Sequence, residues 1–229
     1  KPLFFGRAQR VRRLANELAE IMEIPNSWRV DVASVFSQIG YISLPNSVSE
    51  DVYHKRKLNT EVKEMVKQLP SDTKKVVEKI PGLEDVCEIL NKVDIQYRFE
   101  ENDAAGIRLL ASVLRVALDF DYYEEVGHER TIILQTLKNR SKDYDPIVTD
   151  ALQKLMDLVE QNFRIEEVSI KDLQKGMRLA EDLKVDGDFL VASQGADVDR
   201  QLLKVISNYY SCYEKNPFPQ KIQVKIPNE

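Results

Sequence analysis

Apolar residues recur at helical spacing through roughly the first 160 positions of the chain. Val11, Leu14, Leu18 and Ile21 follow one another at intervals of three and four, which places them on one face of an amphipathic helix. Between residues 28 and 39 apolar side chains lie on nearly every side, so we expect this second helix to form the buried centre of a bundle. Further helices are predicted at about residues 60–69, 71–79, 83–90, 102–120, 128–140 and 146–159.

Prolines mark several of the expected boundaries. Gly40 is expected to end the second helix, and the stretch around Pro45 reads as a polar connection. Pro70 is expected to break the chain between two helices, because proline lacks the amide hydrogen that a helix interior requires. Asp145 before Pro146 is a typical helix start.

The pattern changes near residue 162. Residues 163–170 and 183–191 are rich in β-branched residues, and Asp186-Gly187 is a tight-hairpin signal. Alternation at Ile222, Val224 and Ile226 predicts a last strand, after a helix over about residues 198–209. We therefore predict a mostly α protein, with a helical bundle over residues 1–162 and a small α+β module over residues 163–229.

Composition narrows the function classes. The 33 basic and 38 acidic residues give a net charge of -5, which disfavours nucleic acid and anionic lipid as partners. No apolar run approaches the ~20 residues of a membrane span, so we expect a cytoplasmic protein. Because Lys1 opens the chain, we expect a further domain upstream.

Few residues offer catalytic chemistry. The two histidines, His54 and His128, lie in charged stretches without metal-ligand spacing, and both are expected at the surface. Cys87 lies on an apolar helical stripe and is expected in the core. The acidic residues around Asp119 and Asp121 are interpreted as a solvated helix end rather than a magnesium site. We expect no cofactor, no metal and no enzymatic activity.

An ordered set of short segments resembles the HD-GYP class of bacterial signalling domains, whose active members hydrolyse cyclic di-GMP at a site of two or three metals. The resemblance covers most of the chain. Its landmarks are Arg10-Val11, Ile39-Gly40 followed by residues 42–45, Pro70, residues 80–84 and residues 106–111. Residues 173–182 resemble a module that follows such domains in response regulators.

The resemblance also implies which metal ligands have been replaced. Family histidines and aspartates suit iron or manganese, but other residue types stand at nearly all of their places here. A shift by one helical turn would bring Asp119 to the place otherwise taken by Leu114. The family's metal-ligand positions fall on Arg7, Ser37, Gln38, Leu69, Val93, Asp94 and Leu114. We expect apolar side chains to have filled the former cavity.

These replacements imply a non-catalytic output or regulatory domain of a response regulator, acting through contact with other signalling proteins or domains. The expected partners include a receiver domain upstream in the same chain and a second copy in a homodimer. One alternative is a divergent metal-dependent cyclic di-GMP phosphodiesterase that uses carboxylates such as Asp94, Asp119 and Asp121. Another is a sensor that binds a cyclic dinucleotide without hydrolysis, with Arg7, Arg10 and Arg13 as phosphate or partner contacts.

Overall fold

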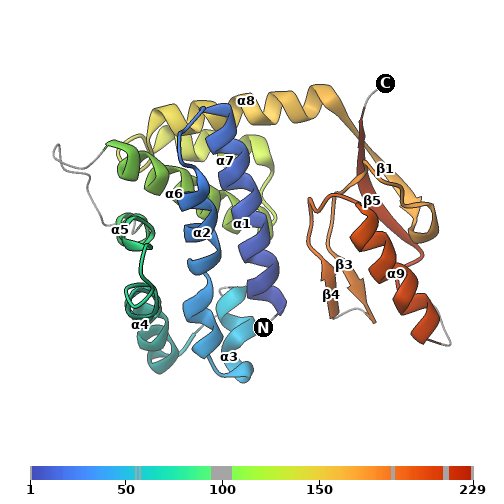
Figure 1. Cartoon of the computed structure of the whole chain (residues 1–229), viewed down its shortest axis with the longest axis horizontal. Helices are drawn as coiled ribbons and strands as arrows, with labels where there is room; N and C mark the ends of the chain where they lie inside the picture. The colour runs from blue at the N-terminus through green and yellow to red at the C-terminus, as the bar shows by residue number, and fades with distance from the viewer. Residues whose placement is uncertain are drawn as a thin grey trace. The chain divides into compact units, whose positions relative to one another are not determined.

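The structure is a computed structural model that describes residues 2–54, 56, 58–93, 105–186, 189–213 and 217–227. The chain divides into two compact units, Leu3–Leu155 and the residues from Met156 onward. The first unit is helical and the second combines strands with a helix, which confirms the predicted fold class (Figure 1). The division expected after residue 162 is the place where helix α8 ends and strand β1 begins.

The helical unit follows the predicted periodicity closely. None of the described helices is long and apolar enough to cross a membrane. In chain order the elements are α1 (Pro2–Ile21), α2 (Trp28–Phe36), the 3-10 helix η1 (Ile39–Ser43), α3 (Asn46–Tyr53), α4 (Thr60–Val77), α5 (Glu84–Lys92), α6 (Ala105–Glu125), α7 (Arg130–Asn139) and α8 (Pro146–Asn162).

Helix α6 is the buried centre of this unit. Leu110, Leu114 and Ala117 on α6 are fully buried, and α6 packs against α2, α5 and α7. Helix α2 was expected in this place, but its Trp28 and Val35 are 49% and 40% exposed. The prediction was wrong because apolar composition alone does not tell a central helix from one that leaves part of its apolar surface in water.

Helix α3 occupies the stretch that was expected to be a polar connection. Val48 and Val52 lie four residues apart and present an apolar edge, and Val52 and Tyr53 are buried. They join a cluster with Phe4 of α1, whose ring meets that of Tyr53 edge to face. Tertiary packing of these few apolar residues therefore orders a short helix that is otherwise polar.

Helix α4 continues through Pro70 instead of breaking there. The buried residues Val62, Leu69, Thr73 and Val77 lie along one face on both sides of the proline. Burying that face offsets the cost of proline in a helix, roughly 3 kcal/mol. Pro70 has no amide hydrogen to donate to the carbonyl of Val66, four residues earlier, so the helix lacks one backbone hydrogen bond at this point.

The second unit contains β1 (Phe163–Ser169), the 3-10 helix η2 (Ile170–Asp172), β2 (Arg178–Leu179), β3 (Leu183–Val185), β4 (Phe189–Ala192), α9 (Arg200–Cys212) and β5 (Lys221–Pro227). Strand β5 lies between β1 and β2 and is antiparallel to both, while β3 and β4 form a separate hairpin. Ile222 and Val224 of β5, Leu179 and Ile206 share one apolar core. The predicted strands and helix are thus present, although Gly187 of the hairpin signal lies outside the described residues.

Candidate functional site

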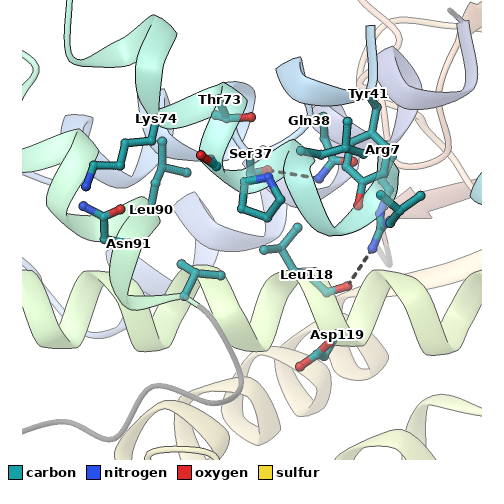
Figure 2. Close-up of a pocket in the computed structure, with 15 residues that line it drawn as sticks. Arg7, Ser37, Gln38, Tyr41, Thr73, Lys74, Leu90, Asn91, Leu118 and Asp119 are labelled. Atoms are coloured by element: carbon teal, nitrogen blue, oxygen red, sulfur yellow. Dashed lines mark hydrogen bonds between the residues drawn. The ribbon is translucent and has the colours of Figure 1, made fainter. Parts of the chain in front are cut away.

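The helical unit contains a pocket of about 600 Å³ (Figure 2). Helices α1, α4, α5 and α6 line it, together with the turn between α2 and η1. A volume of this order is typical of small-molecule sites. The lining residues are Arg7, Ser37, Gln38, Tyr41, Val66, Leu69, Pro70, Ser71, Thr73, Lys74, Leu90, Asn91, Val93, Leu118 and Asp119.

Most of the former metal-ligand positions inferred from the resemblance converge on this pocket. Arg7, Ser37, Gln38, Leu69 and Val93 come from four separate stretches of the chain, and all five line it. Leu114 is instead fully buried in the core of α6 and is not part of the lining. Asp94 lies outside the described residues. The landmarks thus located a cavity that no local motif in the sequence marks.

Asp119 is the carboxylate of the pocket lining. It lies on α6 five residues after Leu114, which agrees with the shift of about one helical turn considered from the sequence. The hydroxyl of Tyr144 donates a hydrogen bond to Asp119 Oδ2 at 2.8 Å. Burial and the neighbouring Asp119 charge together raise the pKa of Tyr144, so this phenol stays protonated and keeps donating.

Arg7 places a permanent cation in the pocket. Its Nη2 donates to the carbonyl of Leu118 at 3.4 Å, and its Nε lies 3.2 Å from Asp121 Oδ2. Nε is buried, and its contact with Asp121 is an ion pair rather than an aligned hydrogen bond, so this donor has no hydrogen-bond partner among the described residues. A guanidinium cannot deprotonate at physiological pH, so it cannot ligate a metal ion.

Gln38 and Ser37 form a short hydrogen-bonded chain at the same end of the pocket. The Ser37 hydroxyl donates to the carbonyl of Ser34 at 2.7 Å, and Gln38 Nε2 donates to Ser37 Oγ at 3.1 Å. Because the one hydroxyl hydrogen of Ser37 is used on Ser34, the amide must turn its nitrogen toward Ser37. Gln38 Oε1 is then left buried, without a hydrogen-bond donor among the described residues.

The expectation that apolar side chains fill the former cavity was wrong. Leu69 and Val93 line the pocket rather than occupy it, because they project from α4 and from the end of α5 as parts of its wall. Replacement of a ligand by an apolar residue removes a donor atom, but it closes a cavity only if neighbouring helices also move inward.

Arg10 lies in a buried ionic cluster that connects α1, α3 and α6. Its Nε donates to Asp121 Oδ1 at 2.6 Å and its Nη2 to the hydroxyl of Tyr53 at 2.7 Å; Tyr53 in turn donates to Glu125 Oε2 at 3.1 Å. Burial alone would lower the pKa of Arg10, but Asp121 and Tyr53 raise it above its ordinary value. Asp121 is 4% exposed, so the interpretation of this acidic stretch as a solvated helix end was wrong.

The other arginines of α1 have different surroundings. Arg10 is buried and committed to Asp121, which argues against its expected role as a phosphate contact. Arg13 is half-buried and is not among the residues that line the pocket. Arg12 forms a two-point ion pair with Asp31, at 2.6 and 2.9 Å. Of the three arginines proposed from the sequence, only Arg7 lines the cavity.

Among the residues with described side chains, histidine, cysteine and carboxylate groups do not gather into a metal site. Across the described ranges, no group of three or more such residues is arranged to hold a metal ion. His54 and His128 are both exposed, as predicted, and Nδ1 of His54 lies 3.7 Å from Glu125 Oε1. Cys87 is buried, also as predicted.

Tyr53 is expected to make the stability of the fold decrease at alkaline pH. Burial raises the pKa of Tyr53 to about 12, although the nearby Arg10 acts in the opposite direction. An unfolded chain has a tyrosine pKa of about 10. Because the folded pKa is the higher one, the neutral hydroxyl stabilises the fold fully below pH ~10 and stops doing so as the pH approaches 12.

We therefore expect the free energy of unfolding to fall between these two pH values, and to fall less steeply in Tyr53→Phe, which has no phenol to ionise. Urea denaturation at a series of pH values measures both slopes. Tyr144, whose pKa is also raised, contributes equally to the two proteins. Equal slopes would contradict the assignment to Tyr53.

Comparison with known protein families supports the landmarks. A family model described as HD domain matches residues 1–148, which is more than half of the chain and includes the described residues of the pocket lining. No curated protein and no solved structure matches the chain significantly.

Proposed function

The chain belongs to the HD-domain family, and we propose that this HD domain is a non-catalytic regulatory output domain of a bacterial signal-transduction protein. Its fold is the phosphohydrolase-like fold of the family, while the described residues of its pocket supply few of the metal-binding donors that active members use. The proposal includes a cytoplasmic location and action through contact with other signalling proteins or domains. A receiver domain upstream and a second copy of the chain are the partners that we propose first.

The observation that carries the proposal is the chemical make-up of the pocket. At the inferred ligand positions it presents a guanidinium, a hydroxyl, an amide and two aliphatic side chains, those of Arg7, Ser37, Gln38, Leu69 and Val93. Iron, manganese and zinc sites are built mainly from imidazole, thiolate and carboxylate groups. Asp119 is the one carboxylate of the described lining, and a single monodentate ligand does not hold such an ion.

Electrostatics also disfavour a metal ion. The cation of Arg7 stands at one of the ligand positions, and the side chain of Lys74 lines the pocket as well. Both would repel an incoming divalent cation at close range. Asp121 offsets part of the Arg7 charge, but its carboxylate is shared with Arg10 and does not line the pocket, so it is not a donor for a metal ion there. The described donor set therefore does not fit the family metal.

We expect protein purified without chelators to contain no stoichiometric iron, manganese or zinc, because the described lining of the pocket has too few metal-binding donors to retain them. Elemental analysis by mass spectrometry measures the content. One or more metal ions per chain would overturn the proposal. Hydrolysis of cyclic di-GMP with added manganese would overturn it as well, provided that Asp119→Asn abolishes the activity and so excludes a contaminant.

A second candidate function is a sensor that binds a cyclic dinucleotide without hydrolysing it. The retained pocket of about 600 Å³ with Arg7 in its wall favours this candidate. Calorimetric titration with cyclic di-GMP tests it, and Arg7→Gln is the variant in which any measured heat should be lost. Absence of heat at high micromolar ligand removes this candidate and leaves the first proposal standing.

A further inference from the structure

We propose that the pocket binds a free α-amino acid with a large apolar side chain, and that this zwitterion is the ligand through which the domain is regulated. The inference rests on the proposed metal-free function and names a ligand for the same site. In this arrangement Arg7 holds the α-carboxylate, Gln38 Oε1 accepts a hydrogen bond from the α-ammonium group, and the side chain extends along the apolar wall.

The buried side-chain oxygen of Gln38 is the first feature that indicates a ligand with a hydrogen-bond donor. Gln38 is 5% exposed and lines the pocket, and its amide orientation is fixed by Ser37 and Ser34. A buried carbonyl oxygen without a partner is destabilising and is rare in native proteins. The oxygen itself is buried beneath the pocket surface, so the Gln38 side chain has to tilt for a ligand in the pocket to reach it; a ligand that then donates an N–H or ammonium hydrogen removes the deficit.

Arg7 lies at the same end of the pocket as Gln38 (Figure 2). Its positive charge favours an anionic group of the ligand, whereas the Gln38 oxygen favours a hydrogen-bond donor. The guanidinium of Arg7 has one donor without a hydrogen-bond partner among the described residues, Nε, and arginine pairs well with planar carboxylates. An anion alone would sit beside the acceptor oxygen of Gln38. A cation alone would sit beside Arg7. A ligand with adjacent carboxylate and ammonium groups, separated by a single carbon, satisfies both.

The charges of the side chains that line the pocket also favour a zwitterionic ligand. Arg7 and Lys74 are cationic and Asp119 is anionic, so a ligand that carries charges of both signs matches the described lining best. Lys74 lies at the other end, beside Asn91, and is 44% exposed and 3.4 Å from Glu78 Oε1. Because that end is open to solvent and its cation is already paired, the head group of the ligand belongs at the Arg7 end.

Aliphatic side chains form the surface between the two ends. In Figure 2, Leu118 of α6 lies between the two ends, and Leu90 of α5 lies at the Lys74 end, beside Asn91. Removing apolar ligand surface from water against such a wall is favourable in proportion to the area buried. The aliphatic lining residues are Val66, Leu69, Pro70, Leu90, Val93 and Leu118. An apolar amino-acid side chain of the size of leucine or phenylalanine fits this surface.

Calorimetry with four probes tests the inference on the full chain. L-phenylalanine and L-leucine carry both head groups, 3-phenylpropanoate lacks the ammonium group, and 2-phenylethylamine lacks the carboxylate. We expect at least one of the two amino acids to bind. We expect each single-group analogue to bind about tenfold or more weakly than L-phenylalanine, because each leaves one partner unsatisfied.

The variant Gln38→Met separates recognition of the ammonium group from general packing. We expect it to weaken binding of the amino acid about tenfold without weakening binding of 3-phenylpropanoate, since that analogue makes no bond to the amide and its carboxylate is not helped by the Gln38 oxygen. Gln68→Met is the matched control, because Gln68 is exposed on α4 and is not part of the pocket lining. Thermal unfolding of both variants verifies that they are folded.

Two results would overturn the inference. One is the absence of heat with both amino acids at millimolar concentration. The other is equal affinity for L-phenylalanine and for either analogue, which would show that the head group is not recognised. Metal analysis of the same sample keeps the two proposals separate: a metal-free protein that binds no amino acid overturns only the ligand, whereas a stoichiometric metal overturns the proposed function.

Discussion

Replacing Asp121 with asparagine is expected to lower the free energy of unfolding by about 3–5 kcal/mol, because it removes the nearer counter-charge of the buried Arg10 guanidinium and leaves the more exposed Glu125, 3.4 Å away. Asp121 is 4% exposed, and its carboxylate accepts from Arg10 at 2.6 Å and lies 3.2 Å from Arg7. Urea denaturation followed by circular dichroism measures the change. A loss of this size is a large part of the stability of a typical domain.

Two controls isolate the buried pair. Glu64→Gln removes one partner of the exposed Glu64–Lys67 pair, whose side chains are 60% and 68% exposed, and is expected to cost less than about 1 kcal/mol. The double variant Arg10→Met with Asp121→Leu removes both charges and is expected to recover much of the lost stability. If Asp121→Asn costs no more than Glu64→Gln, the cluster does not contribute as described.

Replacing Gly40 with alanine is expected to lower the free energy of unfolding by about 3 kcal/mol, the upper end of the usual cost of overpacking a core. A Cβ atom at this position would stand 2.7 Å from the carbonyl oxygen of Leu69 and 2.7 Å from Thr73 Oγ1. The first of these is backbone, so η1 and α4 would have to move apart. Chemical denaturation measures the loss.

Gly106→Ala is the matched control. A Cβ atom at Gly106, in the first turn of α6, would meet nothing within 4 Å. Alanine is also the better helix former, so stability should be unchanged or slightly increased. A similar loss in both variants would indicate that the close approach of η1 to α4 is not what requires glycine at position 40.

The convergence of distant residues on one pocket was predictable from the sequence because ordered landmarks carry spatial information. Gly40 follows Ser37 and Gln38, and the close packing of its backbone on α4 brings that turn to Leu69. The helical periodicity predicted α1 and α6 well, since their apolar faces are long and regular. Residues such as Arg7 and Val93 could thus be assigned to one site although no short motif joins them.

Features that depend on three-dimensional context were not predictable. Arg10 and Asp121 are 111 positions apart, and nothing in the local sequence of either one indicates the other. The choice between Leu114 and Asp119 required the rotation of α6 about its axis, which an alignment of landmarks leaves uncertain by about a turn. Helix α3 depends on Phe4 of α1, so its own polar sequence predicted a connection.

The proline in α4 has a consequence for how the pocket opens. Val66 and Pro70 both line the cavity, and the hydrogen bond that would have joined them in a regular helix cannot form. Local fluctuations begin where the fewest backbone bonds must be broken. This turn of α4 therefore parts at a lower free-energy cost than a regular helical turn, and it offers a small molecule a route to exchange with solvent while the rest of the helical unit stays folded.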